Sequence, residues 1–180
     1  SDRRVSALDA AVINGAASHA LDFDDCNNTF GGHPSAPVLS ALHALADRMK
    51  PQDSFGVVTF DDKAEIAVPV RPMQDHHLPT VHALIDGIES GGSTDLSAGY
   101  LLGLSEARRH LGATGATVLL LSDGHANVGL RNPLEVGPLA SKAREDKITT
   151  GTIGIGSGYD ELLLSEIATQ GNGGHRFAHS

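Results

Sequence analysis

The sequence has few aromatic residues and lacks most features that mark a specialised class of protein. Aromatic residues make up 4% of the 180 positions and tryptophan is absent, so the core must be built from Ala, Val, Leu and Ile. A single cysteine, Cys26, excludes an internal disulfide bond. No apolar run approaches the roughly 20 residues of a membrane span, and the opening residues SDRRV are not those of a signal peptide. These absences predict a soluble, cytoplasmic domain.

The chain also lacks any run of basic residues. Lys and Arg number 13 against 22 Asp and Glu, which gives a formal net charge of -9. Nucleic acids and anionic membranes bind basic surfaces, so neither is expected as a partner. Cations or basic protein surfaces suit this charge better. With 40% hydrophobic residues, the chain is long enough to form one sizeable core.

The first 50 residues are predicted to form two helices around an acidic loop. Small apolar residues recur near helical spacing over residues 5–21, although an Asn-Gly pair interrupts the run. A second helix is predicted to begin at Pro37. Between them, residues 18–37 (SHALDFDDCNNTFGGHPSAP) bring aspartate, cysteine and histidine side chains into one Gly/Asn-rich segment.

After residue 50, short apolar runs alternate with helical patterns. The runs FGVVTF (55–60), VLLL (118–121) and ITTGTIGIG (148–156) are typical of buried strands. AEIAVPV (64–70) alternates and contains Pro69, which favours an edge strand. Helices are predicted over residues 78–90, 96–111, 133–147 and 161–170. This order predicts an α/β fold, with a mostly parallel sheet covered by helices on both faces.

Two polar loops lie where such a sheet binds ligands, beyond the carboxyl ends of its strands. Asp123 follows the VLLL strand after a single serine, and Thr94 lies in GGSTD (91–95), just before a helix. Both side chains offer hard oxygen donors, which suit Mg²⁺ or Mn²⁺. Two simpler interpretations remain open. Thr94 would cap the helix, and Asp123 with the glycine after it would form a turn.

Residues 47–180 resemble a known family in four segments that follow its order. These are DSFGVVTFDD, GGSTDLSAG, VLLLSDGHANVG and ITTGTIGIGSGYDELLLSEIATQGNGG, and the family is that of von Willebrand factor type A (VWA) domains. The resemblance implies a Rossmann-like, doubly wound sheet with a metal-ion-dependent adhesion site (MIDAS). There, Mg²⁺ is held at the top of the sheet and a carboxylate of a partner protein completes its shell. By position, Thr94 and Asp123 correspond to the family's second-loop threonine and third-loop aspartate. The first-loop signature, Asp-x-Ser-x-Ser, and the apolar strand before it are missing.

Residues 7–46 resemble a second family through the motifs NGAASHALDFDD and HPSAPVL. These resemble the N-terminal helical region of the MmgE/PrpD family of 2-methylcitrate dehydratases and cis-aconitate decarboxylases. The resemblance places Asp22 and His33 at active-site positions, whereas the family's further catalytic groups cannot be recognised downstream. The chain therefore resembles a chimera of an N-terminal helix-loop-helix segment, residues 1–46, and a VWA-like domain, residues 47–180.

Two hypotheses address the missing central strand. In the first, residues 19–24 (HALDFD) fill the gap between the two flanking strands, and Asp25, Asn27 and Thr29 replace the first metal loop with oxygen donors. In the second, the N-terminal residues form a helical hairpin. The sheet then lacks its centre, or a second copy completes it in a strand-swapped homodimer.

The favoured interpretation is a non-enzymatic, protein-binding module that recognises an acidic residue of its partner through Mg²⁺ or Mn²⁺. Thr94 and Asp123 are its predicted ligands, and the three donors of residues 25–29 complete the shell. Two alternatives stay open. One is a hydro-lyase or decarboxylase fragment that uses Asp22 and His33, and the other is a chimera without retained activity.

Overall fold

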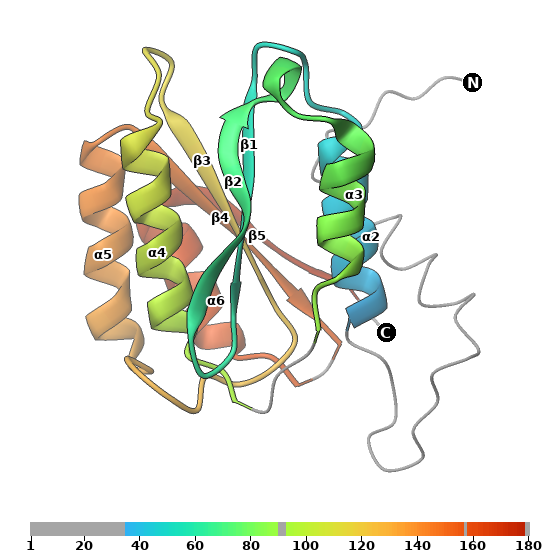
Figure 1. The fold of residues 1–180 in the computed structure, drawn as a ribbon. Helices are drawn as coiled ribbons and strands as arrows, with labels where there is room; N and C mark the ends of the chain where they lie inside the picture. Colours follow the sequence, from blue (N-terminus) through green and yellow to red (C-terminus); the bar gives the residue numbers. More distant parts are fainter. Residues whose placement is uncertain (1–34, 90–92, 157, 179–180) are drawn as a thin grey trace, which may run out of the picture.

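The computed structural model describes residues 35–89, 93–156 and 158–178 (Figure 1). Strands and helices alternate along most of this part of the chain. In order, the elements are α2 (Ser35–Ala46), β1 (Ser54–Phe60), β2 (Ala64–Pro72), a 3-10 turn (Met73–Asp75), α3 (Leu78–Asp86), α4 (Leu96–Arg109), β3 (Ala116–Ser122), α5 (Pro133–Glu145), β4 (Ile148–Ile155), α6 (Glu161–Gln170) and β5 (Asn172–Ala178).

The described strands form two separate sheets. β1 and β2 pair antiparallel as a hairpin, while β3, β4 and β5 pair parallel in that order. Figure 1 shows α4, α5 and α6 on one side of the strands and α2 and α3 on the other. The predicted α/β class, with a Rossmann-like and doubly wound arrangement, is confirmed. The expected sheet is divided, however, because no described strand lies between β1 and β3.

The structure confirms most predicted elements and shifts some of their ends. The last helix, α6, has the predicted bounds, and β1 begins one residue earlier than predicted. Helix α3 ends at Asp86 and is shorter than predicted, because Gly87 follows as its C-cap. Pro69 lies in β2, which pairs only with β1 among the described strands and is therefore the expected edge strand.

The larger core lies between the parallel sheet and α4, α5 and α6. As the composition predicts, aliphatic side chains supply nearly all of it: Leu96, Leu104, Leu120, Ala126, Val136, Ala140, Ala143, Ile148, Leu163, Leu164 and Ile167, together with Tyr100. Tyr100 brings the one hydroxyl of this cluster. That hydroxyl lies 2.7 Å from Thr150 Oγ1, and both residues are buried. The hydrogen bond ties α4 to β4.

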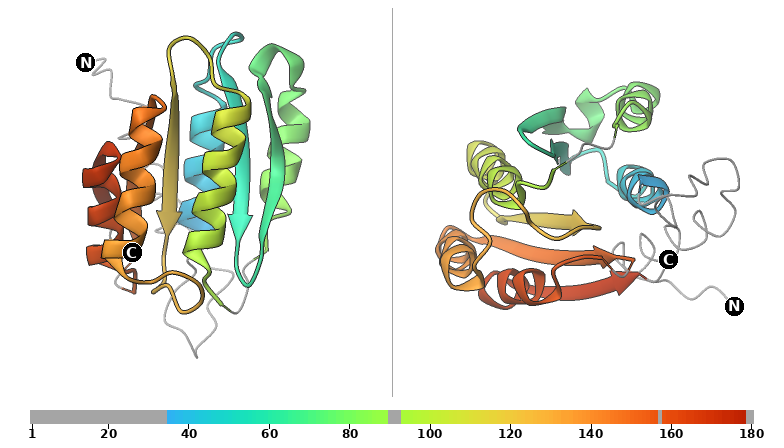
Figure 2. Two further views of the ribbon diagram at one scale, coloured as in Figure 1. Left: turned by 90° about the vertical axis from the view of Figure 1, so that its left-hand side faces the viewer. Right: turned by 90° about the horizontal axis from the view of Figure 1, so that it is seen from below.

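A smaller core joins the hairpin to α2 and α3. Its buried members are Ala46, Phe55, Val57, Val68, Val81 and Ile85. Two polar pairs reinforce the α2–α3 contact, since His43 Nε2 lies 2.8 Å from Asp86 Oδ1 and His82 Nε2 lies 3.0 Å from Asp47 Oδ1. Figure 2 shows α4 in front of the interval between β3 and β1 and α2 behind it. Helix α4 packs against both strands and therefore connects the two cores.

Two predictions fall outside the described residues. These are the helix predicted over residues 5–21 and the hypothesis that residues 19–24 form the central strand. The helix predicted to begin at Pro37 begins at Ser35.

The Tyr100–Thr150 hydrogen bond provides a test of how α4 is held to the parallel sheet. Tyr100→Phe leaves the buried Thr150 hydroxyl without this partner, so the free energy of unfolding should fall by about 1–3 kcal/mol in urea denaturation. Tyr159→Phe is the matched control, because no hydrogen bond of the Tyr159 hydroxyl is present among the described residues. Equal stability of the two variants would contradict a structural role for the buried pair.

Candidate functional site

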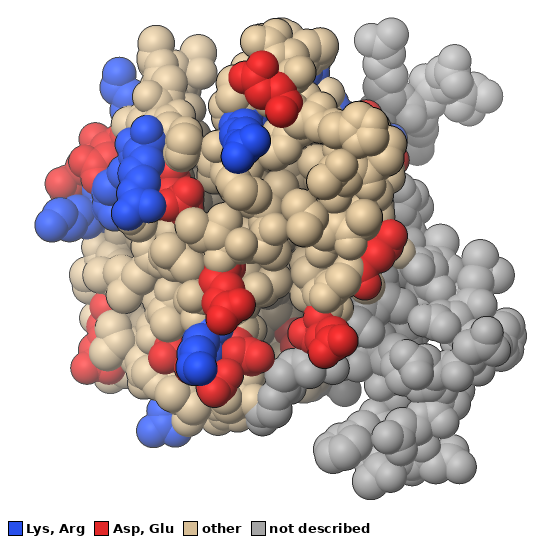
Figure 3. Space-filling view, in the orientation of Figure 1, with Lys and Arg blue, Asp and Glu red and all other residues tan. Residues whose placement is uncertain are grey.

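Three loops meet at the carboxyl ends of β1 and β3. One follows β1 at Asp61, one precedes α4 at Thr94, and one follows β3 at Asp123. Ligands of open α/β sheets bind at this edge, because the loops there diverge to opposite faces. We name this loop cluster the carboxyl rim. Figure 3 shows Asp and Glu side chains grouped at the lower end of the molecule, where the strands end.

Hydrogen bonds hold the three loops of the carboxyl rim together. The Asp95 backbone N–H donates to the Asp61 carbonyl at 2.7 Å, which joins the loop before α4 to the end of β1. The Thr94 backbone N–H donates to Asn127 Oδ1 at 2.8 Å. In return, the backbone N–H groups of Asn127 and Val128 donate to the Thr94 carbonyl at 3.1 and 3.3 Å. Thr94 is therefore fixed against the loop that follows β3.

The structure brings Thr94 close to the segment that carries Asp123. A methyl group built on Gly124 would lie 3.6 Å from Thr94 Oγ1, so the threonine hydroxyl faces the residue directly after Asp123. Thr94 is not the cap of α4, which was the simpler interpretation. Asp95 is the cap, since its Oδ1 accepts hydrogen bonds from the Ala98 backbone N–H at 2.9 Å and from Ser97 Oγ at 2.7 Å.

The two rim carboxylates next to the strand ends have different environments. Burial raises the pKa of Asp123, and a hydrogen bond from its own backbone N–H offsets only part of this effect. At Asp61 the pKa is lowered, chiefly because the Lys63 backbone N–H donates to Asp61 Oδ1 at 3.0 Å, with Asp62 as the second cause. Asp123 is therefore the rim carboxylate whose charge is the less well compensated.

The loop after β3 is anchored to the first turn of α4 at its far end. The Leu130 backbone N–H donates to Ser97 Oγ at 2.9 Å, and Ser97 is buried. Gly129 directly precedes Leu130 and has a φ of 71°, a backbone conformation that favours glycine. A methyl group on Gly129 would overlap Asp95 Oδ1 and Ser97 Oγ. This position thus requires glycine for both its backbone and its space.

The predicted metal ligands divide into a described and an undescribed group. Thr94 and Asp123 lie at the carboxyl rim, whereas the donors predicted at 25, 27 and 29 and the enzyme residues predicted at 22 and 33 lie outside the described residues. Within residues 35–178, as far as they are described, no group of three or more His, Cys, Asp and Glu side chains could hold a metal ion. The described rim therefore supplies only part of a metal shell.

Sequence reasoning missed three residues that shape the carboxyl rim. An Asp one residue before an apolar helical pattern is a capping signal, so Asp95 could have been recognised. Asn127 contacts Thr94 across 33 positions of sequence, and Asp61 contacts Asp95 across the rim. No local pattern marks these two contacts.

Known proteins share the fold of this chain. A von Willebrand factor type A protein from Catenulispora acidiphila superposes with a TM-score of 0.64 at 16% identity, covering 75% of this chain and 32% of that chain. The proximal thread matrix protein 1 of the mussel byssus, in a structure described as having a zinc-occupied MIDAS motif, gives a TM-score of 0.56 at 24% identity, with 76% and 37% covered. The chain thus has a VWA-like fold.

Sequence comparison finds a similar protein and a matching family model. The uncharacterized protein YfbK of Escherichia coli (strain K12) is 32% identical over 164 residues, which cover 89% of this chain and 28% of YfbK. The chain therefore spans about a quarter of that relative's length. The model of the MmgE/PrpD N-terminal domain matches residues 1–108, and the chain belongs to this family. The predicted combination of MmgE/PrpD and VWA-like features in one polypeptide is confirmed.

Gly129 allows a test of the anchored loop. Gly129→Ala should lower the free energy of unfolding by about 1–3 kcal/mol, because alanine is strained at this φ and its methyl group would displace the Asp95 cap. Gly112→Ala serves as control, since a methyl group there meets nothing within 4 Å. Urea denaturation measures the loss, and hydrogen exchange of residues 94–98 should increase. Unchanged exchange in the Gly129 variant would show that the loop is not anchored as described.

Proposed function

We propose that the chain is a protein-binding, VWA-like module that holds a divalent metal at the carboxyl rim and recognises an acidic residue of its partner through it. One observation carries the proposal. Hydrogen bonds between separate loops fix Thr94 against residues 127 and 128, with its hydroxyl beside the residue that follows Asp123. The VWA-like fold and the zinc-occupied MIDAS motif named for the mussel protein support it.

The donor chemistry of the rim fits a hard cation. Thr94 and Asp123 offer oxygen only, as Mg²⁺ or Mn²⁺ prefers. Burial disfavours the charged form of Asp123, so a bound cation would supply the compensation that its surroundings lack. When bound, the metal would provide an electrostatic anchor for a partner carboxylate. Without a cation, Asp61, Asp62 and Asp123 would repel that carboxylate.

Asp25, Asn27 and Thr29 are proposed to complete the metal shell. Helix α2 begins at Ser35 at the same end of the molecule as the carboxyl rim (Figure 1). Thr29 lies six positions and Asp25 ten positions before that residue in sequence. Fully extended, six to ten residues span at most about 20–35 Å. The Asp-x-Asn-x-Thr spacing then replaces the missing Asp-x-Ser-x-Ser loop.

The described helices and the net charge bear on where the module acts and what it binds. Within the described residues, no helix is both long and apolar enough to cross a membrane. We propose a cytoplasmic module whose partner is a protein, not a nucleic acid or a membrane surface, in agreement with its net charge of -9. A homodimer, including a strand-swapped one, is compatible with the divided sheet.

Calorimetric titration of the full chain with Mg²⁺ tests the metal proposal. Saturable binding is expected, and Asp123→Asn should abolish it, because the substitution removes the anionic ligand. Asp75→Asn is the matched control, since Asp75 is exposed and lies in the 3-10 turn. Binding should weaken on acidification, because protons compete for Asp123 from a higher pH than at an exposed aspartate. The absence of binding at millimolar Mg²⁺ would refute the metal site.

The same raised pKa has a defined effect on the metal-free protein. The folded state binds a proton at Asp123 more readily than the unfolded state does, so this group makes stability fall as pH rises through its raised pKa. Asp123→Asn removes this dependence. The difference in free energy of unfolding between the variant and the wild type should therefore grow with pH in chelator. If this difference in free energy of unfolding shrinks as pH rises, the pKa of Asp123 is not raised in the folded state.

The MmgE/PrpD match supports a second candidate function. Residues 1–108 match the N-terminal domain of that family, and within them Asp22 and His33 take the positions implied by the resemblance. If the chain retains hydro-lyase or decarboxylase activity, it should turn over cis-aconitate or 2-methylcitrate. His33→Ala should abolish the turnover and His110→Ala, at the C-cap of α4, should preserve it. The absence of turnover in the wild type would leave the binding module as the function.

A further inference from the structure

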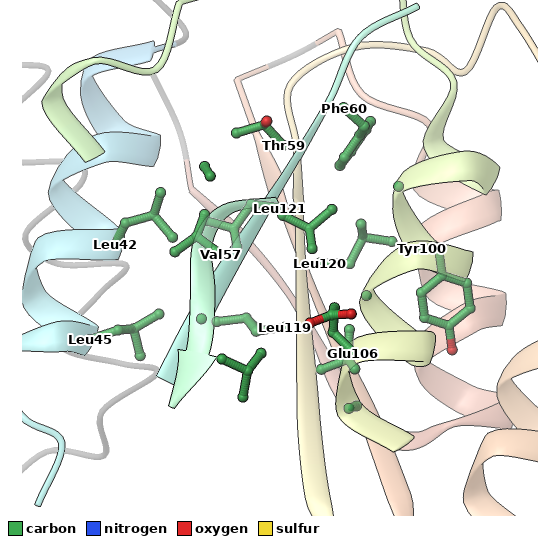
Figure 4. Close-up of a pocket in the computed structure, with 18 of the residues that line it drawn as sticks. Leu42, Leu45, Val57, Thr59, Phe60, Tyr100, Glu106, Leu119, Leu120 and Leu121 are labelled. Carbon is green, nitrogen blue, oxygen red and sulfur yellow. The ribbon is translucent and has the colours of Figure 1, made fainter. Parts of the chain in front are cut away.

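The facing edges of β1 and β3 border a large cavity lined by described residues. β1 pairs only with β2 and β3 only with β4, so each strand has one edge with no described strand beside it. The cavity between them has a volume of about 2200 Å³. We name it the interstrand slot. In Figure 4, Leu42 and Leu45 of α2 lie on one side of the slot and Glu106 of α4 lies on the other.

The interstrand slot has two apolar walls of different character. The wall toward α2 is formed by leucine, valine and threonine side chains: Leu42, Leu45, Val57, Thr59, Leu119 and Leu121. The wall toward α4 contains Gly99 and Gly103, with Val118 Cγ1 3.8 Å from a methyl group built on Gly103. The ring of Phe60 covers Gly99, so this wall is already filled there. A segment in the slot therefore meets branched side chains toward α2 and accepts only small side chains toward α4.

The burial of the described strands agrees with the absence of a described strand between β1 and β3. Every residue of β4 except Thr149 is buried, as expected for a strand covered on both faces and both edges. In β3 only Leu120 and Ser122 are buried, although its sequence is equally apolar. β1 likewise keeps only Phe55 and Val57 buried. Two strands with the composition of central strands thus each have an edge beside which no described strand lies.

We propose that the interstrand slot binds an extended segment of a partner protein by strand addition, parallel to β1 and β3. β1 and β3 have seven residues each, so the segment spans about seven residues. The main-chain groups of the two edges would supply the hydrogen bonds, and the two walls would select its alternate side chains. A typical hydrogen bond that replaces a bond to water contributes about 0.5–1.5 kcal/mol, so the several bonds of two strand edges together favour such a segment.

The charges around the slot define the ends of the partner segment. Asp61, Asp62 and Asp123 lie at the carboxyl end of the slot, with Lys63 as the basic residue among them. At the opposite end, Asp53 and Lys147, which directly precede β1 and β4, line the slot. Glu65 and Glu89 also line it. The central charged residue, Glu106, is buried and paired with Arg109 at 2.6 Å. In the metal-free protein, the occupant is therefore an uncharged strand followed by Lys or Arg at its carboxyl end.

The same charges disfavour an occupant from this chain. Residues 19–24 would bring Asp22 and Asp24 to one face of a strand, against apolar walls and an acidic rim. Buried carboxylates without a cationic partner cost several kcal/mol. Elsewhere in residues 1–34 the longest apolar run is AAVI (10–13), four residues against the seven of β1 and β3. A partner protein supplies such a strand more readily than this chain does.

A designed peptide tests the proposal on the full chain. The probe is acetyl-VAVAVAVKK-amide, whose valines match the α2 wall, whose alanines match the α4 wall and whose lysines match the acidic rim. Calorimetry in chelator should show saturable binding with a Kd of about 100 μM or tighter. Chelator separates this outcome from that of the metal proposal. VAVPVAVKK, which lacks one backbone donor, and KKVAVAVAV, which moves the charges to the other end, should each bind at least about tenfold more weakly.

A pair of protein variants completes the test. Leu119→Glu places a charge in the slot wall and should weaken peptide binding at least about tenfold, while Leu134→Glu, at a side chain that is 79% exposed on α5, should not. The proposal is overturned if the wild type binds no peptide at millimolar concentration, or if the proline peptide binds equally well. Strong amide protection of residues 19–24 would then identify this chain as the occupant, and a concentration-dependent dimer would identify a second copy.

Discussion

The backbone hydrogen-bonding groups on the facing edges of β1 and β3 are the constraint on which the rest of the structure depends. A sheet normally satisfies such groups with its next strand, and edges left open promote association with other chains. Here the hairpin and the parallel sheet share no ladder among the described residues. Among the described residues, the two halves of the domain are therefore joined through the contacts that α4 makes with both.

Helix α4 provides much of the connection that a central strand would otherwise supply. Its Gly99 allows the ring of Phe60, at the end of β1, to pack directly against the helix backbone. The next residue, Tyr100, forms a hydrogen bond with Thr150 in β4. At its N-terminus, Asp95 caps the helix and bonds to the Asp61 carbonyl beyond β1. One helix thus contacts the hairpin, the parallel sheet and the carboxyl rim.

Local signals in the sequence were sufficient for the elements but not for their pairing. Short apolar runs between turn residues predicted β1, β3 and β4, because composition and length decide such strands. The partial exposure of Leu119 and Leu121 could not be predicted, since a run of leucines has the same sequence whether or not a neighbouring strand exists. The sequence left open that Thr94 caps α4, and the structure shows Asp95 as the cap, because both residue types cap helices and only the geometry distinguishes them. Asn127 reaches Thr94 through tertiary structure alone.

The two family resemblances overlap in the elements that hold the domain together. The MmgE/PrpD match extends to residue 108, through α2, the hairpin and most of α4. Yet the carboxyl rim depends on contacts that need no central strand. Asp95 bonds to Ser97 and Thr94 bonds to Asn127, and Gly129 lies beside Asp95 and Ser97. These contacts hold the rim together although no described strand lies between β1 and β3. A binding surface built from independently anchored loops can survive such a junction. A catalytic pocket, which needs every group at once, is far less tolerant of it.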